Sequence, residues 1–455
     1  MTSAIRAGLA VLFLLTAARS FAATGVDAAT FLRQTERYAE VRVTGVRAGD
    51  AAVALELRRF EVFARNVQLV ADDGHDNVKP LPRPLTRYYT GRVAGDGGGS
   101  VFLAVEPDGR ARGIVDRDGA AASIDGDATR ALRLVPIDTS TPRTDGGFRC
   151  DSDDLAQARG IVEKARAGQA QAATPAGVTR PYRARVAIET DYEFFQKFND
   201  APRAIAYVGD VIGYASTKYT AEIDTRLEVV YVRLWTSADD PWSNETSSNC
   251  ALYGFGTYWN ANMTGVSRTF AHMLSARQTS GGSAWIGALC AAPFSVQISA
   301  GSCNFGSGTL SAGGDYGYTG RLNGAFDPGN PQVIWDVEAP AHEIGHNFNS
   351  PHTHCYNGIG GNPDPIDRCY NGQIGCYSGV TSLPGPAGQG SGTIMSYCHL
   401  LSPGMANISM NFGTGHAYGT APERVATRMK NYVADLAQTN PGCVVDDTLF
   451  ADGFE

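Results

Sequence analysis

The stretch AHEIGHNFNSPHTHC, residues 341–355, holds four of the eight histidines of this 455-residue chain. His342 and His346 are four positions apart, so on an α-helix their imidazoles lie on one face, about one turn from each other. Glu343 follows the first of these histidines directly, at the edge of the same face. The spacing therefore predicts a helix that presents two imidazoles and one carboxylate to a common point.

Two imidazoles one turn apart can reach a single zinc ion at about 2.0–2.1 Å, and a catalytic zinc takes three protein ligands and keeps one position open for water. His352 is a suitable third ligand if the helix ends before it. Asn349 favours such an ending, because asparagine tolerates the left-handed conformation found at helix ends. We predict one catalytic zinc ion on His342, His346 and His352. Glu343 is then the general base that takes a proton from the zinc-bound water.

The first residues, MTSAIRAGLAVLFLLTAARSFAATG, have the pattern of a secretory signal peptide. Arg6 gives a positive start, residues 7–18 are apolar, and small residues precede a cut after Ala22 or Ala23. The apolar run is shorter than the ~20 residues of a membrane span, and no other segment is apolar enough for stable membrane insertion. We expect residues 1–23 to be removed and the protein to be secreted, with a periplasmic or surface-associated location as the alternative.

Composition and charge place the chain among ordinary globular proteins. It is 43% hydrophobic and 18% charged, with a formal net charge of −8, and its length allows two or three domains. No basic run stands out, which argues against nucleic acid as a partner. In an exported globular chain, three histidines at ligand spacing around a turn residue are better explained by a metal than by isolated core or surface histidines.

The hydrophobic pattern divides the chain into four parts after the signal peptide. Residues 24–150 alternate apolar and polar side chains between Gly-rich turns, which predicts a β-rich domain. Residues 151–179 read as a linker, with a charged, Ala-rich start that suggests a short helix. Residues 180–445 show strand and helix patterns and then a loop-rich half, which predicts one α/β domain with an irregular part. Residues 446–455 form a C-terminal tail.

Nine cysteines should pair in an oxidising compartment, so one of them is left over. Eight lie after residue 240, whereas Cys150 stands alone just before the linker. A thiolate at that place could occupy the open zinc position and exclude water. The alternative is that Cys150 is paired and that another cysteine is left over.

These motifs resemble those of the metzincin clan of zinc peptidases. HEIGHNFNSPH, residues 342–352, resembles the signature H-E-x-x-H-x-x-G-x-x-H, and GTIMSYC, residues 392–398, looks like the Met-turn, with Met395 beneath the zinc. Within the clan, the signature stretch is most similar to the adamalysin/reprolysin branch. GSAWIGALC (282–290) is similar to the rim strand of that branch, and the Gly-rich stretch 87–115 is similar to its pro-domains. The resemblance therefore covers most of the chain.

The resemblance implies a secreted zinc metalloendopeptidase that is made as a zymogen, acts on protein or peptide substrates and is expected to be a monomer. Its fold would be α/β (α+β), with a twisted, mostly parallel five-stranded sheet, helices and an irregular lower subdomain, preceded by the β-rich pro-domain. Substrate would lie extended along the edge strand near Ala284 to Ala288. An activating cut would fall within residues 151–179.

The sequence departs from the family pattern at four places. Asn349 replaces the signature glycine, and Thr353 replaces the acidic residue that usually follows the third histidine and makes a supporting hydrogen bond. Pro340 either kinks the helix or makes it start late, because proline lacks the N–H of an interior position. Tyr397 follows the Met-turn methionine by two residues, as in astacins and serralysins, where a tyrosine ligates zinc or steadies the transition state. The alternative for Tyr397 is a packed loop residue.

The resemblance also assigns the cysteines. RCD, residues 149–151, loosely resembles the matrixin cysteine switch, which makes Cys150 the blocking thiolate. Cys290 would pair with Cys443 and staple the two ends of the peptidase domain. Four cysteines would pair among themselves in the loop under the zinc, and Cys250 is then left for Cys303. Those four are Cys355, Cys369, Cys376 and Cys398.

Two other functions stand as alternatives. The first is a catalytically weak zinc-fold module for binding or adhesion, which loss of the glutamate would mark; Glu343 is present. The second is an exopeptidase, which the open-ended cleft implied by the resemblance disfavours. Asp364 and Asp367 offer a structural calcium site, although an ordinary Asx-rich turn is the preferred interpretation.

Overall fold

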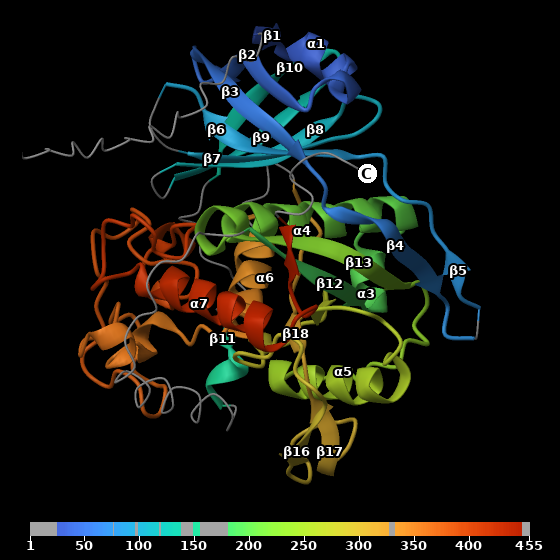
Figure 1. Cartoon of the computed structure of the whole chain (residues 1–455), viewed down its shortest axis with the longest axis vertical. Coiled ribbons are helices and arrows are strands. Elements are labelled where there is room, and N and C mark those ends of the chain that lie inside the picture. The colour runs from blue at the N-terminus through green and yellow to red at the C-terminus, as the bar shows by residue number, and fades with distance from the viewer. Residues whose placement is uncertain are drawn as a thin grey trace, which may run out of the picture.

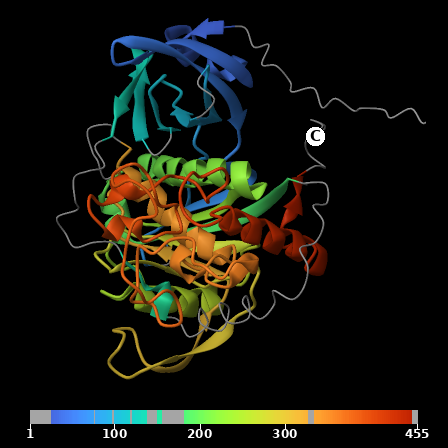
Figure 2. The same ribbon diagram turned by 90° about the vertical axis from the view of Figure 1, so that its left-hand side faces the viewer.

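The computed structural model describes residues 25–75, 77–95, 99–117, 120–137, 149–154, 181–326 and 333–447. The predicted signal peptide, the part of the predicted linker after residue 154 and the end of the tail lie outside these stretches. Figure 1 and Figure 2 show a β-barrel on one side of a long helix and an α/β unit on the other. Within the described stretches, no helix is long and apolar enough to cross a membrane.

Seven strands form the barrel: β2 (Glu40–Ala48), β3 (Ala51–Phe60), β6 (Arg87–Val93), β7 (Ser100–Val105), β8 (Ala111–Arg117), β9 (Ala120–Asp127) and β10 (Arg130–Pro136). They follow one another in the order β2-β10-β9-β8-β7-β6-β3, and β3 pairs with β2 to close the ring. All neighbours are antiparallel except β10 and β2. Strand β1 (Gly25–Asp27) adds to β2, and helix α1 (Ala28–Arg33) buries three side chains in the barrel core. The β-rich prediction for this region is confirmed.

The α/β unit is built on a second sheet. Five of its strands come from residues after 180, in the order β15 (Gly281–Ala284), β18 (Tyr316–Thr319), β14 (Phe270–Leu274), β12 (Tyr182–Thr190) and β13 (Thr225–Trp235). The last four are parallel to one another, and β15 is antiparallel at the edge. This part of the sheet is therefore mostly parallel, as the resemblance implied.

Helices cover both faces of this sheet. One face carries α4 (Ala201–Ile223) and α6 (Val333–Asn347), and the other carries α5 (Ser248–Asn262). Side chains of β12 alternate between the two apolar cores, because successive residues of a strand point to opposite faces. The short helix α3 (Tyr192–Gln196) follows β12, and α7 (Arg424–Thr439) packs beside α4.

The region before residue 150 supplies strands to both edges of the α/β sheet. β4 (Phe63–Asp72) follows the barrel strand β3 directly but pairs parallel with β13, and β5 (Lys79–Pro80) adds to β4. At the opposite edge, β11 (Arg149–Cys150) pairs parallel with β15. The hydrophobic pattern of this region predicts strands but does not predict that some of them leave the barrel.

The barrel rests on α4 through aromatic side chains. Gly209 and Gly213 leave room on the helix, since a Cβ at either position would collide with Tyr88 or Phe102 of the barrel. These aromatic rings belong to the same apolar core as α4 and the sheet beneath it. Two ion pairs flank the contact, Arg112–Asp210 and Lys218–Asp116.

The remaining chain is irregular and is held by disulfides. A hairpin of β16 (Phe294–Ile298) and β17 (Gly308–Gly313) projects beside α5, loops and short 3-10 turns lie between α6 and α7, and β19 (Val445–Asp446) returns to β12. The four disulfides are Cys250–Cys303, Cys290–Cys443, Cys355–Cys376 and Cys369–Cys398. The predicted pairings are confirmed, and Cys150 takes part in none of the four.

Candidate metal centre

Helix α6 carries the first two histidines of the signature and ends where the sequence predicted. Pro340 lies inside the helix, so the expectation of a late start is wrong. Asn349 has a φ of 75°, the left-handed conformation, and its N–H donates to the carbonyl of His346 at 2.8 Å. The N–H of Ser350 donates to the carbonyl of Gly345 at 3.1 Å. These bonds cap the last turn and send the chain back along the helix.

The three histidines bring their Nε2 atoms together. His352 Nε2 lies 3.0 Å from His342 Nε2 and 3.2 Å from His346 Nε2. Ligand nitrogens on one tetrahedral zinc ion stand about 3.3 Å apart. All three side chains are buried. The three nitrogen atoms are therefore spaced as ligands of one ion.

Backbone carbonyls hold the opposite nitrogens of two of these rings. Nδ1 of His342 lies 2.6 Å from the oxygen of Ile394, and Nδ1 of His346 lies 2.7 Å from the oxygen of Ser350. A proton on Nδ1 leaves Nε2 with a lone pair for a metal. Burial lowers the pKa of His342 well below its usual value and that of His352 to about 3. Both rings are neutral at neutral pH, which is the form that binds zinc, so the residues present fit this ion.

Glu343 lies fully buried beside these rings. Its Oε2 accepts a hydrogen bond from the thiol of Cys150 at 3.4 Å. The edge strand passes close above it, since a Cβ at position 282, a glycine, would collide with the carboxylate. The carboxylate therefore sits between the helix and the edge strand, where an extended chain along that strand would pass over it.

Met395 lies on the other side of the last turn of α6. It is buried, and its Sδ packs against Gly345, where there is no space for a Cβ. Its carbonyl accepts from the N–H and the hydroxyl of Thr353 at 3.0 and 3.2 Å. Thr353 thus ties the segment of the third histidine to the Met395 loop, although it is not the acidic residue typical of the family.

The sulfur of Cys150 lies beside the Nε2 atoms of the three histidines. Sγ lies 3.4 Å from Nε2 of His346, and the ligand atoms of Cys150 and the three histidines all lie within 4.8 Å of one another. A sulfur and a nitrogen on one tetrahedral zinc ion stand about 3.6 Å apart. Four ligand atoms are therefore within reach of one ion, three from the histidines and one from the segment before the linker.

Tyr397 is packed against the same centre. Its buried ring lies 4.3 Å from that of His352, measured between centroids. Its hydroxyl donates to the backbone carbonyl of Cys150 at 2.6 Å. The tyrosine therefore contacts both the third histidine and the segment that covers the centre.

Two further groups of potential ligand residues occur in the described part of the chain. Each consists of a disulfide with one neighbour, His354 or Asp367, and cysteines bonded to each other are not thiolate ligands. Nε2 of His354 lies 2.7 Å from the side-chain oxygen of Gln373. Asp367 is buried and accepts from the N–H of Cys369 at 3.0 Å, whereas Asp364 is exposed. Of the two aspartates considered for calcium, one is therefore buried and the other is exposed.

Sequence reasoning missed a buried carboxylate that lies beside the first histidine of α6. Glu338 lies one turn before His342, with Oε1 3.8 Å from Nδ1 of that ring. Burial raises the pKa of Glu338 to about 8, so this carboxyl is protonated at neutral pH. Its spacing of four residues from His342, on the same helix face, is the signal that could have found it.

The edge strand is shorter than expected. β15 ends at Ala284, and the chain then turns toward α6. The N–H of Gly287 donates to the carbonyl of His346 at 2.9 Å, and the N–H of Ala288 donates to that of Asn347 at 3.1 Å. The expectation of an extended edge from Ala284 to Ala288 is therefore wrong, because these groups bind the helix instead. The backbone that can pair with an extended chain lies at 281–284.

Three imidazoles whose Nε2 atoms meet at one point, with a buried carboxylate beside them, are the donor set of a zinc-dependent hydrolase. Residues 180–409, just over half of the chain, match metallo-peptidase family M12. The chain belongs to this family and is a zinc metallopeptidase. A search of curated proteins finds no match. Among solved structures, metalloproteinase-II from Bacteroides fragilis is similar at 13% identity and a TM-score of 0.35, over 72% of this chain and 89% of that chain.

Proposed function

We propose that this chain is a secreted zinc-dependent endopeptidase of the adamalysin/reprolysin branch of the metzincins, made as a zymogen. The position of Cys150 carries the proposal, because its sulfur lies among the Nε2 atoms of the three histidines. A donor set suited to a catalytic ion is present, and its fourth position is taken by a residue from the region before the linker. Such an arrangement is expected of a latent peptidase.

The residues around the centre have distinct proposed roles. The three histidines would hold one zinc ion, which when bound supplies a Lewis acid that polarises water and the scissile carbonyl. Glu343 would take a proton from the attacking water and pass it to the leaving amine. Tyr397, whose hydroxyl now donates to the carbonyl of Cys150, would donate to the oxyanion of the substrate once that segment has left. Met395 would support the histidines from below.

The proposed processing follows the divisions of the sequence. Residues 1–23 would be removed on export, and 24–150 would act as the pro-domain. A cut would fall within 151–179, ahead of the peptidase domain at 180–445, and release of the segment 149–154 from the metal centre would complete activation. This division is supported by β11, which reaches from the pro-domain to the edge strand over the metal centre. No role is assigned to the tail, 446–455.

The proposed substrate is an extended stretch of a protein or peptide chain. It would pair with the backbone of β15 at 281–284, the edge that β11 now occupies. Pairing through backbone groups does not require a free chain end. This mode of binding supports an endopeptidase rather than an exopeptidase.

The test compares the intact chain with a doubly cut chain, in which engineered protease sites within 138–148 and 155–180 release the segment 149–154. Casein is the substrate, and bound zinc is measured by metal analysis. We expect cleavage by the doubly cut chain only, with one zinc ion per chain. Glu343→Gln should keep the zinc and lose about 10²- to 10⁴-fold in rate. Glu423→Gln, at an exposed glutamate before α7, is the matched control and should remain active.

The other outcomes separate the alternatives. A chain that binds zinc but cleaves neither casein nor a peptide library in any form would favour the binding or adhesion module. Equal cleavage by the intact and the doubly cut chain would refute latency. A chain without zinc would refute the proposed metal centre.

A further inference from the structure

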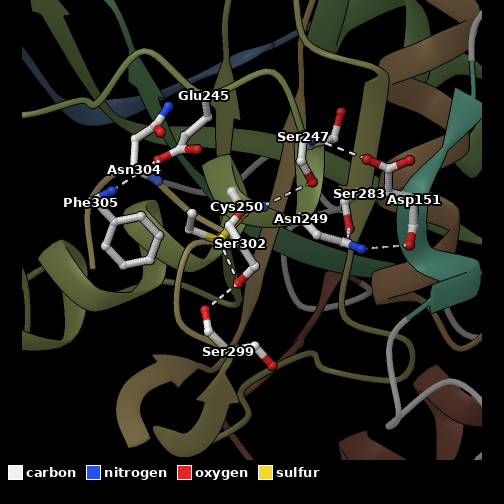
Figure 3. Close-up of a disulfide and its surroundings, with 12 residues drawn as sticks. Asp151, Glu245, Ser247, Asn249, Cys250, Ser283, Ser299, Ser302, Asn304 and Phe305 are labelled. Carbon is white, nitrogen blue, oxygen red and sulfur yellow. Dashed lines mark hydrogen bonds between the residues drawn. A yellow bond between two sulfur atoms is a disulfide. The ribbon is translucent and has the colours of Figure 1, made fainter. Parts of the chain in front are cut away.

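The segment that covers the metal centre also binds a group of polar residues at the start of α5, namely Ser248, Asn249 and Ser280, which is called the pocket below. Asp151 follows Cys150, and one of its carboxylate oxygens accepts from the backbone N–H of Ser248 at 3.0 Å. The same oxygen accepts from the hydroxyl of Ser280. The backbone carbonyl of Asp151 accepts from the side-chain amide of Asn249 at 3.0 Å. Figure 3 shows Asp151 facing the start of α5.

The donors of this pocket are oriented by their own neighbours. Ser248 is the first residue of the 15-residue helix α5, where the backbone N–H groups carry a partial positive charge. Its hydroxyl accepts from the N–H of Gly281 at 2.9 Å and lies 3.0 Å from the hydroxyl of Ser280. The amide oxygen of Asn249 accepts from the hydroxyl of Ser283 at 2.6 Å, which leaves its NH₂ for the pocket. The edge strand and its approach thus hold the donors in place.

The pocket is also rigid. The disulfide Cys250–Cys303 fixes the first turn of α5, directly after the donors (Figure 3). Ser248 and Ser283 are fully buried. Donors that are already in position need little reorganisation when an anion enters, which favours binding. These features distinguish the pocket from a bare helix N-terminus.

The pocket lies on the path of an extended chain along the edge strand. Cys150 is opposite Gly282 in the register of β11 and β15. Two residues further, the hydroxyl of Ser152 accepts from the N–H of Ala284 at 2.9 Å and donates to its carbonyl at 3.1 Å. The side chain in the pocket, that of Asp151, therefore belongs to the residue next to the one over the metal centre.

We propose that the backbone N–H of Ser248 and the hydroxyl of Ser280 form an acidic subsite of the peptidase, which selects substrates with an Asp or Glu side chain next to the scissile bond. Asn249 would hold the backbone carbonyl of the same substrate residue. The proposal rests on the proposed peptidase function. In the latent chain Asp151 fills the acidic subsite, and removal of the segment 149–154 vacates it. A carboxylate fits better than a neutral amide, because both groups that reach the side chain of Asp151 donate to it, and bonds to a charged acceptor are stronger.

The test uses the doubly cut chain and pairs of fluorogenic peptides that differ only by Asp or Asn, one pair for each position near the scissile bond. We expect kcat/KM at one position to favour Asp by about ten-fold or more, with a smaller preference at high salt. Ser280→Ala should reduce the preference, and Ser280→Asp should abolish or invert it. Ser302→Ala, at an exposed serine beside the disulfide, is the control and should leave it unchanged.

The outcomes distinguish failure of the acidic subsite from failure of the peptidase function. Cleavage with no preference for Asp at any position would overturn the subsite and leave the peptidase intact. If no peptide is cleaved, binding of the labelled peptide FRCDSDD, residues 148–154, to the doubly cut chain decides the question. Replacing Asp151 of this peptide with Asn should weaken its binding about ten-fold, and equal binding would overturn the proposal.

Discussion

The N-terminal fragment should stay bound to the peptidase domain when the chain is cut on both sides of residues 149–154. After those cuts only non-covalent contacts join the two parts. β4 remains in the sheet beside β13, and the aromatic side chains of the barrel remain in the core that α4 shares. The cut protein should therefore behave as a complex of two fragments rather than as a free peptidase domain.

The contribution of a single side chain to the association of the two fragments can be estimated at Phe102. This side chain is 1% exposed, and its ring stands edge to face with that of Tyr214 on α4, 6.1 Å away between centroids. Replacing a buried phenylalanine with alanine costs about 3–5 kcal/mol. Since about 1.4 kcal/mol corresponds to ten-fold in affinity, Phe102→Ala should weaken the association of the fragments by roughly two to three and a half powers of ten.

The next residue provides the control. Leu103 is equally buried but points into the barrel core, away from α4. Leu103→Ala should destabilise the barrel by about 2–5 kcal/mol and leave the association almost unchanged. Size-exclusion chromatography of a dilution series, with both fragments followed by gel electrophoresis, measures the association. Dissociation of the unmutated fragments at micromolar concentration, or equal release by the two variants, would refute the reasoning.

Three further predictions follow from single sites. Cys150→Ala in the intact chain should cleave casein, but more slowly than the doubly cut chain does. The reason is that the contacts of Asp151 still hold the segment 149–154 in place. No activity at all would show that the thiol alone does not block the centre. Replacing Cys290 and Cys443 with serine should lower the free energy of unfolding by about 5 kcal/mol, because the bridge closes a 153-residue loop, and urea unfolding measures this. Burial lowers the pKa of His272 to about 3, so only the unfolded state gains its proton as the pH falls below about 6.5. The contribution of His272 to stability should fall by up to about 1.4 kcal/mol per pH unit in that range. Urea titrations at pH 7 to 4 should therefore differ in slope between the unmutated chain and His272→Gln, and identical slopes would contradict this.

The metal centre could be predicted because its residues are close in the sequence and their geometry is local. The helical repeat alone places His342 and His346 on one face, and the preference of asparagine for positive φ locates the turn before His352. The structure has both features. Cys150 could be singled out by counting cysteines, although its distance from the histidines depends on the whole fold.

Contacts between segments that are distant in the sequence could not be predicted from a local pattern. β4 has the same alternation as the barrel strands before it, and its pairing with β13 depends on an open sheet edge that forms only in the fold. The residues of the acidic subsite are small polar side chains of a kind common at helix starts and turns. Ser248 and Ser280 become a site only where α5 and the approach to β15 lie side by side.

The attachment of the barrel bears on how latency ends. A single cut within residues 155–180 separates the segment 149–154 from the peptidase domain, but the segment stays joined to the barrel through the chain before it. If the barrel remains bound, the tether keeps the segment 149–154 near the metal centre at an effective concentration in the millimolar range. The segment then rebinds faster than a substrate at a lower concentration can bind. We therefore expect a singly cut chain to remain latent toward casein and the doubly cut chain to be active. Phe102→Ala should then activate the singly cut chain on dilution, because the barrel carries the segment away with it, whereas Leu103→Ala should not. Full activity of the unmutated chain after a single cut, with the barrel still bound, would show that the tethered segment does not compete.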